Sequence, residues 1–240
     1  YITIALNALK GESDISMITA TFMQIDTAIW AYVAPKNREA IRLAVANAAE
    51  ALLDGAKPGS DHQLQYARAF ANNAVTPAQL DRLKAMLDGS VNGLTVDAEL
   101  RWYIFICGVK RGVFGPTEIQ TESAKDNTAH GKQYTAYAYA AIPTKEAKAA
   151  AFTSVTTDNL SNTIHSYMCR GFNENIHHEL LAGFVDQYFD AILKVWETKG
   201  FEVAETTATL TFPTWAISEE TVKKAQHWLD VTGKDASHAL

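Results

Sequence analysis

The chain has 240 residues, and its 21 basic and 27 acidic side chains give a formal net charge of -6 at pH 7. With 48% hydrophobic residues, a chain of this length is expected to fold into a globular body that buries roughly 70% of its unfolded surface. The acidic excess, without any run of five like charges, argues against nucleic acid as a partner. No apolar run approaches the roughly 18 to 20 residues of a membrane span, so a membrane partner is not expected either.

Helical periodicity is clear from Pro35 to Asp54. Proline suits the first turn of a helix, and Gly55 followed by Pro58 suits its end. Apolar residues recur there at the spacing of one helix face, namely Ile41, Ala44, Val45, Ala48 and Leu52.

Two further helices are predicted to begin where a capping hydroxyl precedes a glutamine by three residues, as in Ser60 with Gln63 and Thr76 with Gln79. Later starts are expected near Asp97, Pro116, Asn127, Thr144, Asp158, Asn173 and Ser218, and stops at Gly89, Gly112, Gly171 and Gly200. The segment 201–212 is rich in threonine, but Val203, Thr207 and Leu210 fit a helix face, and a lone strand would have no partner. A helix is therefore predicted there as well.

These signals predict an all-α fold of about ten to twelve helices. Short connections favour antiparallel neighbours, and helix pairs recur loosely at roughly 40 residues, the range of HEAT and armadillo units. We therefore expect an α-α superhelix of antiparallel helix pairs, forming one helical-repeat domain over residues 1–240. Because the chain starts at Tyr1 inside an apolar pattern, we expect it to be a fragment of a longer protein. Cys107 and Cys169 are expected to be buried, reduced thiols in a cytoplasmic setting.

The stretch NIHHELLAG, Asn175 to Gly183, resembles the zinc motif HExxH, which places two histidines one helical turn apart. Here Ala182 stands where the second histidine would be. On a continuous helix Glu179 would face solvent, and His177 would lie on the apolar face as a packed histidine bonded to a backbone carbonyl. Glu174 and His177 form an ExxH pair, but a di-iron site needs a second copy, and the chain has none. No metal ligand is predicted in this stretch.

Other signatures of catalysis are missing from the sequence. It has no GxSxG nucleophile elbow, no GxGxxG and no complete P-loop. We therefore assign no catalytic residue, no metal ligand and no cofactor to the chain itself.

Four ordered stretches carry a family resemblance: PGSDHQLQYARAF (58–70), LTVDAELRW (94–102), DNTAHG (126–131) and YFDAILKVW (188–196). Together they resemble the helical C-terminal domain of the gluzincin zinc aminopeptidases, of the aminopeptidase N type found in actinobacteria. The resemblance implies a parent hydrolase whose zinc is held by HExxH and a distant glutamate on a catalytic domain outside this sequence. It also implies that the present chain walls a cavity over that zinc and controls peptide access. The expected partners are the catalytic domain of the same chain and peptides.

Three side chains are candidates for peptide or cavity contacts. Arg101 offers a bidentate grip for a peptide carboxylate, although Asp97 four residues earlier is a natural ion-pair partner. Arg170 precedes Gly171, where a cation also complements the end of a helix. His130 beside Gly131 is the third candidate, with an ordinary surface histidine as the alternative.

Two other readings remain open. A free-standing helical-repeat scaffold that binds peptides or a partner protein explains the helix pairs equally well. An all-helical enzyme whose histidine and carboxylate converge only in three dimensions is the third reading.

Overall fold

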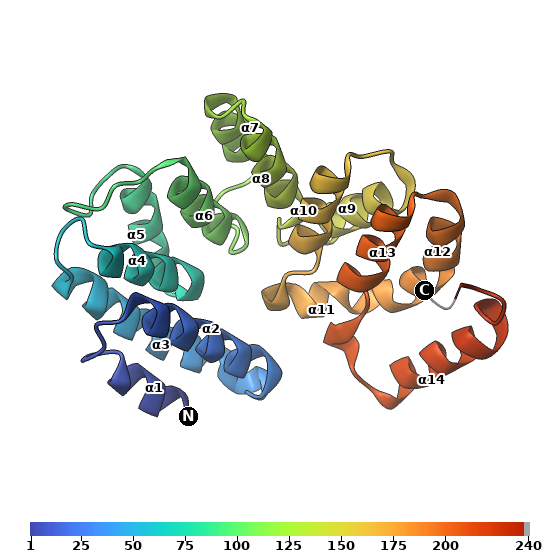
Figure 1. Ribbon diagram of the computed structural model, residues 1–240, viewed down its shortest axis with the longest axis horizontal. Coiled ribbons are helices and arrows are strands. Elements are labelled where there is room, and N and C mark those ends of the chain that lie inside the picture. The colour runs from blue at the N-terminus through green and yellow to red at the C-terminus, as the bar shows by residue number, and fades with distance from the viewer. Residues whose placement is uncertain (238–240) are drawn as a thin grey trace. The chain divides into compact units, whose positions relative to one another are not determined.

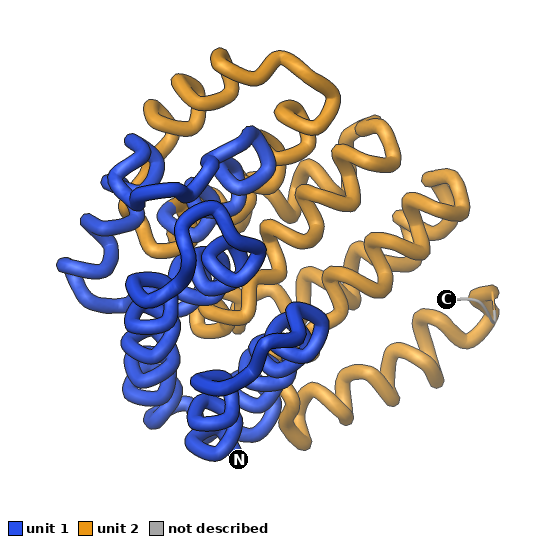
Figure 2. The backbone as a smooth tube through the Cα atoms, turned by 60° about the vertical axis from the view of Figure 1, so that its left-hand side comes forward, with its two compact units in different colours: residues 1–108 blue, residues 109–240 orange. Residues whose placement is uncertain are grey.

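The computed structural model describes residues 1–237, and these residues form helices and turns without a strand. The predicted all-α class is therefore correct. None of the helices in this part of the chain combines the length and hydropathy needed to cross a bilayer. The contacts divide the chain into two compact units, residues 1–108 and 109–240, shown in blue and orange in Figure 2. The expectation of one continuous repeat domain stays a prediction.

Unit 1 contains the first helices in Figure 1: α1 (Ile2–Ala8), α2 (Ile15–Ala31), α3 (Pro35–Gly55), α4 (Asp61–Asn73), α5 (Pro77–Leu87) and most of α6 (Ala98–Val109). Their starts follow the capping signals. The Ser60 hydroxyl accepts a hydrogen bond from the backbone N–H of Gln63, and Thr76 with Gln79 forms a complete capping box. In α3 the buried face is made of Val45, Ala46, Ala49 and Leu53. Ala44, predicted to be on that face, is exposed.

Hydrogen bonds within unit 1 show how its helix pairs are stacked. His62 on α4 contacts the Ser13 carbonyl just before α2, and Asn72 at the other end of α4 donates to Asp26. The order of these contacts makes α2 and α4 parallel. In the same way, Gln79 and Arg82 of α5 bond to Asn47 and Glu50 of α3. Unit 1 therefore stacks the hairpin α2–α3 on the hairpin α4–α5.

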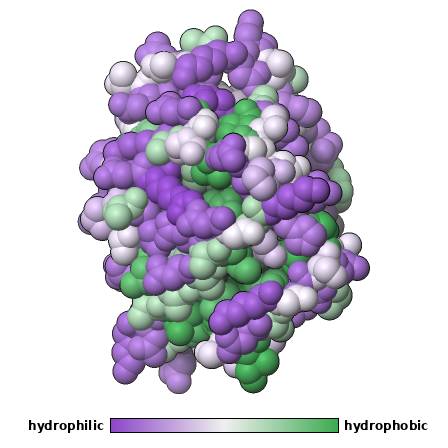
Figure 3. Space-filling model, turned by 90° about the vertical axis from the view of Figure 1, so that its left-hand side faces the viewer, coloured by the Kyte–Doolittle hydropathy of each residue, from purple (hydrophilic) through white to green (hydrophobic). Residues whose placement is uncertain are grey.

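Apolar side chains fill the centre of unit 1, from Leu9 and Ile18 through Phe70 to Ile104. Some large apolar side chains instead reach the surface, including Tyr1, Ile4, Met17, Met23 and Tyr32. Figure 3 shows a face on which apolar side chains gather between hydrophilic ones.

Unit 2 contains the later helices: α7 (Pro116–Lys125), α8 (Ala129–Ala140), α9 (Lys145–Thr157), α10 (Asn162–Phe172), α11 (His178–Leu181), α12 (Val185–Thr198), α13 (Phe201–Leu210) and α14 (Glu219–His227). Short 3-10 turns cover Asn175–His177, Ala182–Phe184 and Thr214–Ala216, and a π-helical turn covers Trp228–Thr232. The predicted helix at 201–212 is confirmed as α13. Start signals at Pro116, Thr144 and Ser218 are also confirmed.

Two rows of helices make up most of unit 2. In one row, Tyr134 of α8 packs on Tyr167 of α10. His165 of α10 bonds to Thr207 of α13, and Asn173, just after α10, donates to the Leu210 carbonyl. In the other row, Lys199 after α12 bonds to the Thr157 carbonyl of α9, and Trp228 after α14 bonds to the Phe189 carbonyl of α12. The contacting residues of α10 and α13 are 37 to 42 positions apart, which agrees with the expected helix-pair spacing.

One helix bound in unit 2 agrees closely with the sequence and another does not. Gly171 is buried in the last turn of α10, which ends at Phe172, one residue after the expected stop. Asp158 does not start a helix but caps the end of α9, and α10 begins after Ser161.

Candidate functional site

Arg101 lies on α6 and is half-buried. Its guanidinium donates to the carbonyl of Leu87, which is the last residue of α5, over 3.0 Å. A cation at this position satisfies a carbonyl that the end of α5 leaves without a helical partner. The structure thus gives Arg101 a role in joining α6 to the end of α5. A contact with peptide stays a prediction.

His130 and Arg170 are both exposed and lie in unit 2. His130 is in the first turn of α8, and Arg170 is in the last turn of α10 with its guanidinium 5.8 Å from the ring centre of Tyr167. Because α8 and α10 run parallel, these two residues stand at opposite ends of the helix pair. The structure does not bring them together, and their predicted peptide contacts stay predictions.

The segment containing NIHHELLAG is not one helix. It passes through the 3-10 turn Asn175–His177, the single turn α11 and the 3-10 turn Ala182–Phe184 before α12 begins. Glu179 is exposed and His177 is buried, as predicted. The imidazole Nε2 of His177 donates to the Lys110 carbonyl over 2.8 Å, which confirms the predicted packed histidine. Within residues 1–237 no group of three or more His, Cys, Asp or Glu side chains is placed to hold a metal ion.

A buried ion network surrounds His177. Glu174 accepts a hydrogen bond from the Tyr137 hydroxyl, and its carboxylate lies 3.2 Å from the Lys110 ammonium. Burial alone would raise the pKa of Glu174, but the Lys110 charge and the Tyr137 hydroxyl outweigh burial and lower it. Burial, reinforced by the positive charge of Lys148, lowers the pKa of His177 to about 4. The network therefore contains an ionised Glu174 and a neutral His177 at pH 7.

Lys148 is fully buried at the ends of two helices. Its ammonium donates to the carbonyls of Ala140 at the end of α8 and of Gly171 and Phe172 at the end of α10, over 2.8 to 3.0 Å. Burial lowers the pKa of Lys148 to about 7, although Glu174 opposes this shift. The side chain acts as a shared cap for two parallel helices, whose last carbonyls otherwise have no partner.

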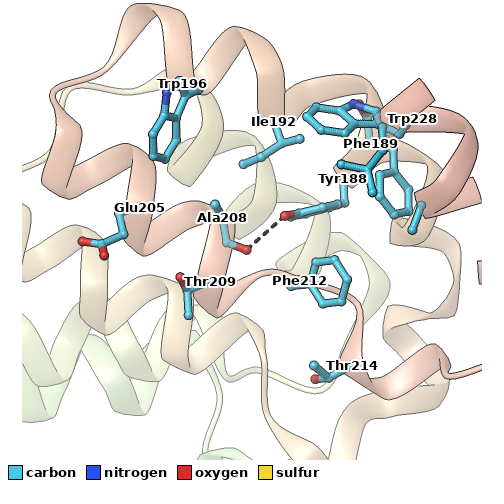
Figure 4. Close-up of a pocket in the computed structure, with 12 residues that line it drawn as sticks. Tyr188, Phe189, Ile192, Trp196, Glu205, Ala208, Thr209, Phe212, Thr214 and Trp228 are labelled. Carbon is cyan, nitrogen blue, oxygen red and sulfur yellow. Dashed lines mark hydrogen bonds between the residues drawn. The ribbon is translucent and has the colours of Figure 1, made fainter. Parts of the chain in front are cut away.

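An aromatic pocket of about 510 Å³ lies between α12, α13 and α14. Its walls include the aromatic side chains Tyr188, Phe189, Trp196, Phe212 and Trp228 (Figure 4). The Tyr188 hydroxyl donates to the Ala208 carbonyl over 3.0 Å, and the Trp228 indole donates to the Phe189 carbonyl. These bonds tie α12 to both neighbouring helices, and they hold two of the aromatic rings in place.

The rings of the pocket support one another. Tyr188 meets Phe212 edge to face with centroids 5.5 Å apart, and Trp196 meets Phe201 in the same way at 5.7 Å. Glu205 and Thr209, both exposed, complete one edge. A volume of this size is typical of small-ligand sites, which combine apolar walls with a few polar groups.

Sequence reasoning did not identify this pocket. The run YFDAILKVW was visible as an apolar stripe, but the pocket also needs Phe212 and Trp228 from later elements. Aromatic residues at helical spacing usually fill a core. The available signal was their density, since Tyr188, Phe189 and Trp196 fall within nine residues.

These observations define the class of protein: an all-helical chain of stacked helix pairs, with a buried ion network and an aromatic surface pocket. The ERAP1-like C-terminal domain family matches residues 1–239, and the chain belongs to that family.

The chain is also 40% identical over 232 residues to aminopeptidase N of Streptomyces lividans. That alignment covers 95% of this chain but 27% of the Streptomyces protein. The chain therefore spans about a quarter of the length of this relative.

Proposed function

We propose that this chain is the non-catalytic C-terminal domain of a zinc aminopeptidase and that it walls the cavity over the zinc site. The observation that carries the proposal is the 40% identity to aminopeptidase N along nearly the whole chain. The zinc and the residues that activate water belong, in this proposal, to the part of the parent protein that precedes this chain. The chain itself contributes shape and contacts.

The physical role of such a wall is control of access. An enclosed chamber admits short, flexible peptides and excludes folded proteins, and water excluded from the chamber strengthens electrostatic interactions at the metal. Stacked helix pairs suit this role because each pair contacts its neighbours along a continuous curved face. The partners of the chain are then the catalytic domain of the same protein and the peptides that pass along the wall. A cytoplasmic setting is part of the proposal, because Cys107 and Cys169 are buried and do not form a disulfide.

The first experiment separates the chain from its parent. The purified 240-residue chain is expected to hydrolyse no aminoacyl anilide and to hold no stoichiometric zinc by atomic absorption. The full-length parent should hydrolyse the anilide and hold zinc. Hydrolysis or tight zinc binding by the chain alone would overturn the proposal.

The second experiment measures peptide length. In the full-length parent, kcat/KM is compared for an aminoacyl anilide, for peptides of increasing length, and for a folded protein with the same accessible N-terminal sequence. A walled chamber predicts hydrolysis of the anilide and short peptides and none of the folded protein. The parent without this chain should retain the anilide activity and lose the dependence on length. If that truncated protein does not fold, rapid cleavage of the folded protein by the full-length parent still contradicts the proposal.

A further inference from the structure

The aromatic pocket of unit 2 carries a single charge. Among the described residues that line it, Glu205 is the acidic side chain, and no lysine, arginine or histidine is present. Glu205 is exposed, and it forms no ion pair within residues 1–237. In Figure 4 it lies toward the Trp196 side of the pocket, away from Phe189 and Trp228. The pocket is therefore apolar at one end and negative at its edge.

This distribution suits a ligand with an apolar body and a positive tip. Aromatic faces attract cations, and the attraction increases when a carboxylate is close. A guanidinium fits such a site better than an ammonium, because it is planar, weakly hydrated and able to stack on an indole. Trp196 and Glu205 lie at the same side of the pocket (Figure 4), and they are the two groups that a guanidinium entering there would meet.

The volume of the pocket exceeds what one side chain needs. At about 510 Å³ it lies within the range of sites that hold whole small molecules. Phe212 and Leu229, which are 39% and 57% exposed, border the apolar part and leave it accessible from solvent. An apolar residue next to an arginine would fill this part.

We propose that this pocket binds peptides through an arginine, with its guanidinium between Trp196 and Glu205 and an adjacent apolar side chain among the aromatic rings. Binding at this pocket is a property of the chain itself and goes beyond the proposed role as a wall around a zinc site. It is measured without the catalytic part of the parent, so failure of either proposal leaves the other standing.

The test uses isothermal titration calorimetry on the 240-residue chain. The probe is acetyl-Phe-Arg-amide, whose guanidinium is its one charge, and the matched peptide is acetyl-Phe-citrulline-amide, which has nearly the same shape without the charge. We expect the arginine peptide to bind about tenfold more tightly than the citrulline peptide. The difference should shrink at high salt, because an exposed carboxylate is screened.

Two variants assign the effect to the pocket. Glu205→Gln should bring the affinity for the arginine peptide most of the way to that of the citrulline peptide, because only the attraction to the Trp196 ring remains. Glu197→Gln removes the same charge from an exposed position on α12 outside the pocket lining, and it should leave both affinities unchanged. Equal affinity for the two peptides, equal effects of the two substitutions, or no heat of binding at millimolar peptide would each overturn the proposal.

Discussion

Gly171 of α10 packs directly against the main-chain carbonyl of Tyr137 on α8. A Cβ atom at position 171 would lie 2.3 Å from that oxygen and 3.0 Å from the Ala140 Cβ. Backbone atoms cannot move aside as a flexible side chain can. The close approach of α8 and α10 therefore requires glycine at this position.

Gly171→Ala is expected to lower the free energy of unfolding by about 1 to 3 kcal/mol, the usual cost of overpacking a buried contact. The matched control is Gly183→Ala, since a Cβ there meets nothing within 4 Å. That control should be neutral or slightly stabilising, because alanine reduces the freedom of the unfolded chain. Urea denaturation of both variants measures the difference, and equal effects would contradict the close packing.

Lys148→Met removes the donor shared by three buried carbonyls. We expect a loss of about 2 to 4 kcal/mol in the free energy of unfolding, because these oxygens would be left without a partner. Lys145→Met on the exposed side of the same helix should change stability by less than about 0.5 kcal/mol. Denaturant titrations near pH 7 measure both values.

The lowered pKa of Lys148 also predicts a dependence on pH. The folded protein releases its proton near pH 7 and the unfolded chain near the ordinary lysine pKa of 10.5, so the unfolded state binds more protons between these values. Stability should therefore rise with pH in this window, by at most about 1.4 kcal/mol per unit. The stability difference between wild type and Lys148→Met should widen from pH 7 to pH 10. A constant difference would show that Lys148 keeps its proton in the folded state.

His177 predicts a loss of stability in acid. Its pKa is about 4 in the folded protein against 6.5 for the free side chain, so the unfolded state binds the extra proton as the pH falls from 6.5 to 4. The free energy of unfolding should fall in this window by up to about 1.4 kcal/mol per unit. His177→Gln should remove this part of the pH dependence, whereas His130→Gln on the surface should leave it unchanged. Thermal unfolding across pH 4 to 7 would show the difference.

Helix capping gives a further comparison. Thr76 forms a capping box with Gln79 at the start of α5, whereas Ser161 at the start of α10 makes no side-chain capping bond. Thr76→Ala should cost about 1 kcal/mol and Ser161→Ala distinctly less. Similar losses in the two variants would mean that the capping box does not stabilise α5.

Arg101 and Arg170 are tested in the full-length parent. Arg101→Ala should lower stability, because it removes a donor to the Leu87 carbonyl, and Arg170→Ala should have little effect, because that side chain is exposed. If either residue contacts peptide, its variant should raise KM for peptides of several residues and leave the aminoacyl anilide unaffected. Unchanged kinetics for every peptide length would remove both as peptide contacts.

Local signals in the sequence determined the helix starts well. The structure confirms four of the predicted starts, at the N-cap residues Ser60, Thr76, Thr144 and Ser218. These starts are predictable because a cap bonds to backbone amides two or three residues away. The burial of His177 was also predicted correctly, although the prediction assumed one continuous helix and the segment is broken into three short turns before α12. The family resemblance likewise came from ordered short stretches of sequence.

Tertiary structure alone decided the features that depend on residues distant in sequence. Gly171 lies one residue before the end of α10, but the requirement for glycine there comes from the Tyr137 carbonyl on α8. Lys148 resembles an ordinary surface lysine, and it is buried because two helix ends converge on it. The aromatic pocket likewise exists because α12, α13 and α14 pack together. Each of these contacts joins residues more than seven positions apart, and no local pattern of spacing or composition encodes which distant partner a side chain will meet.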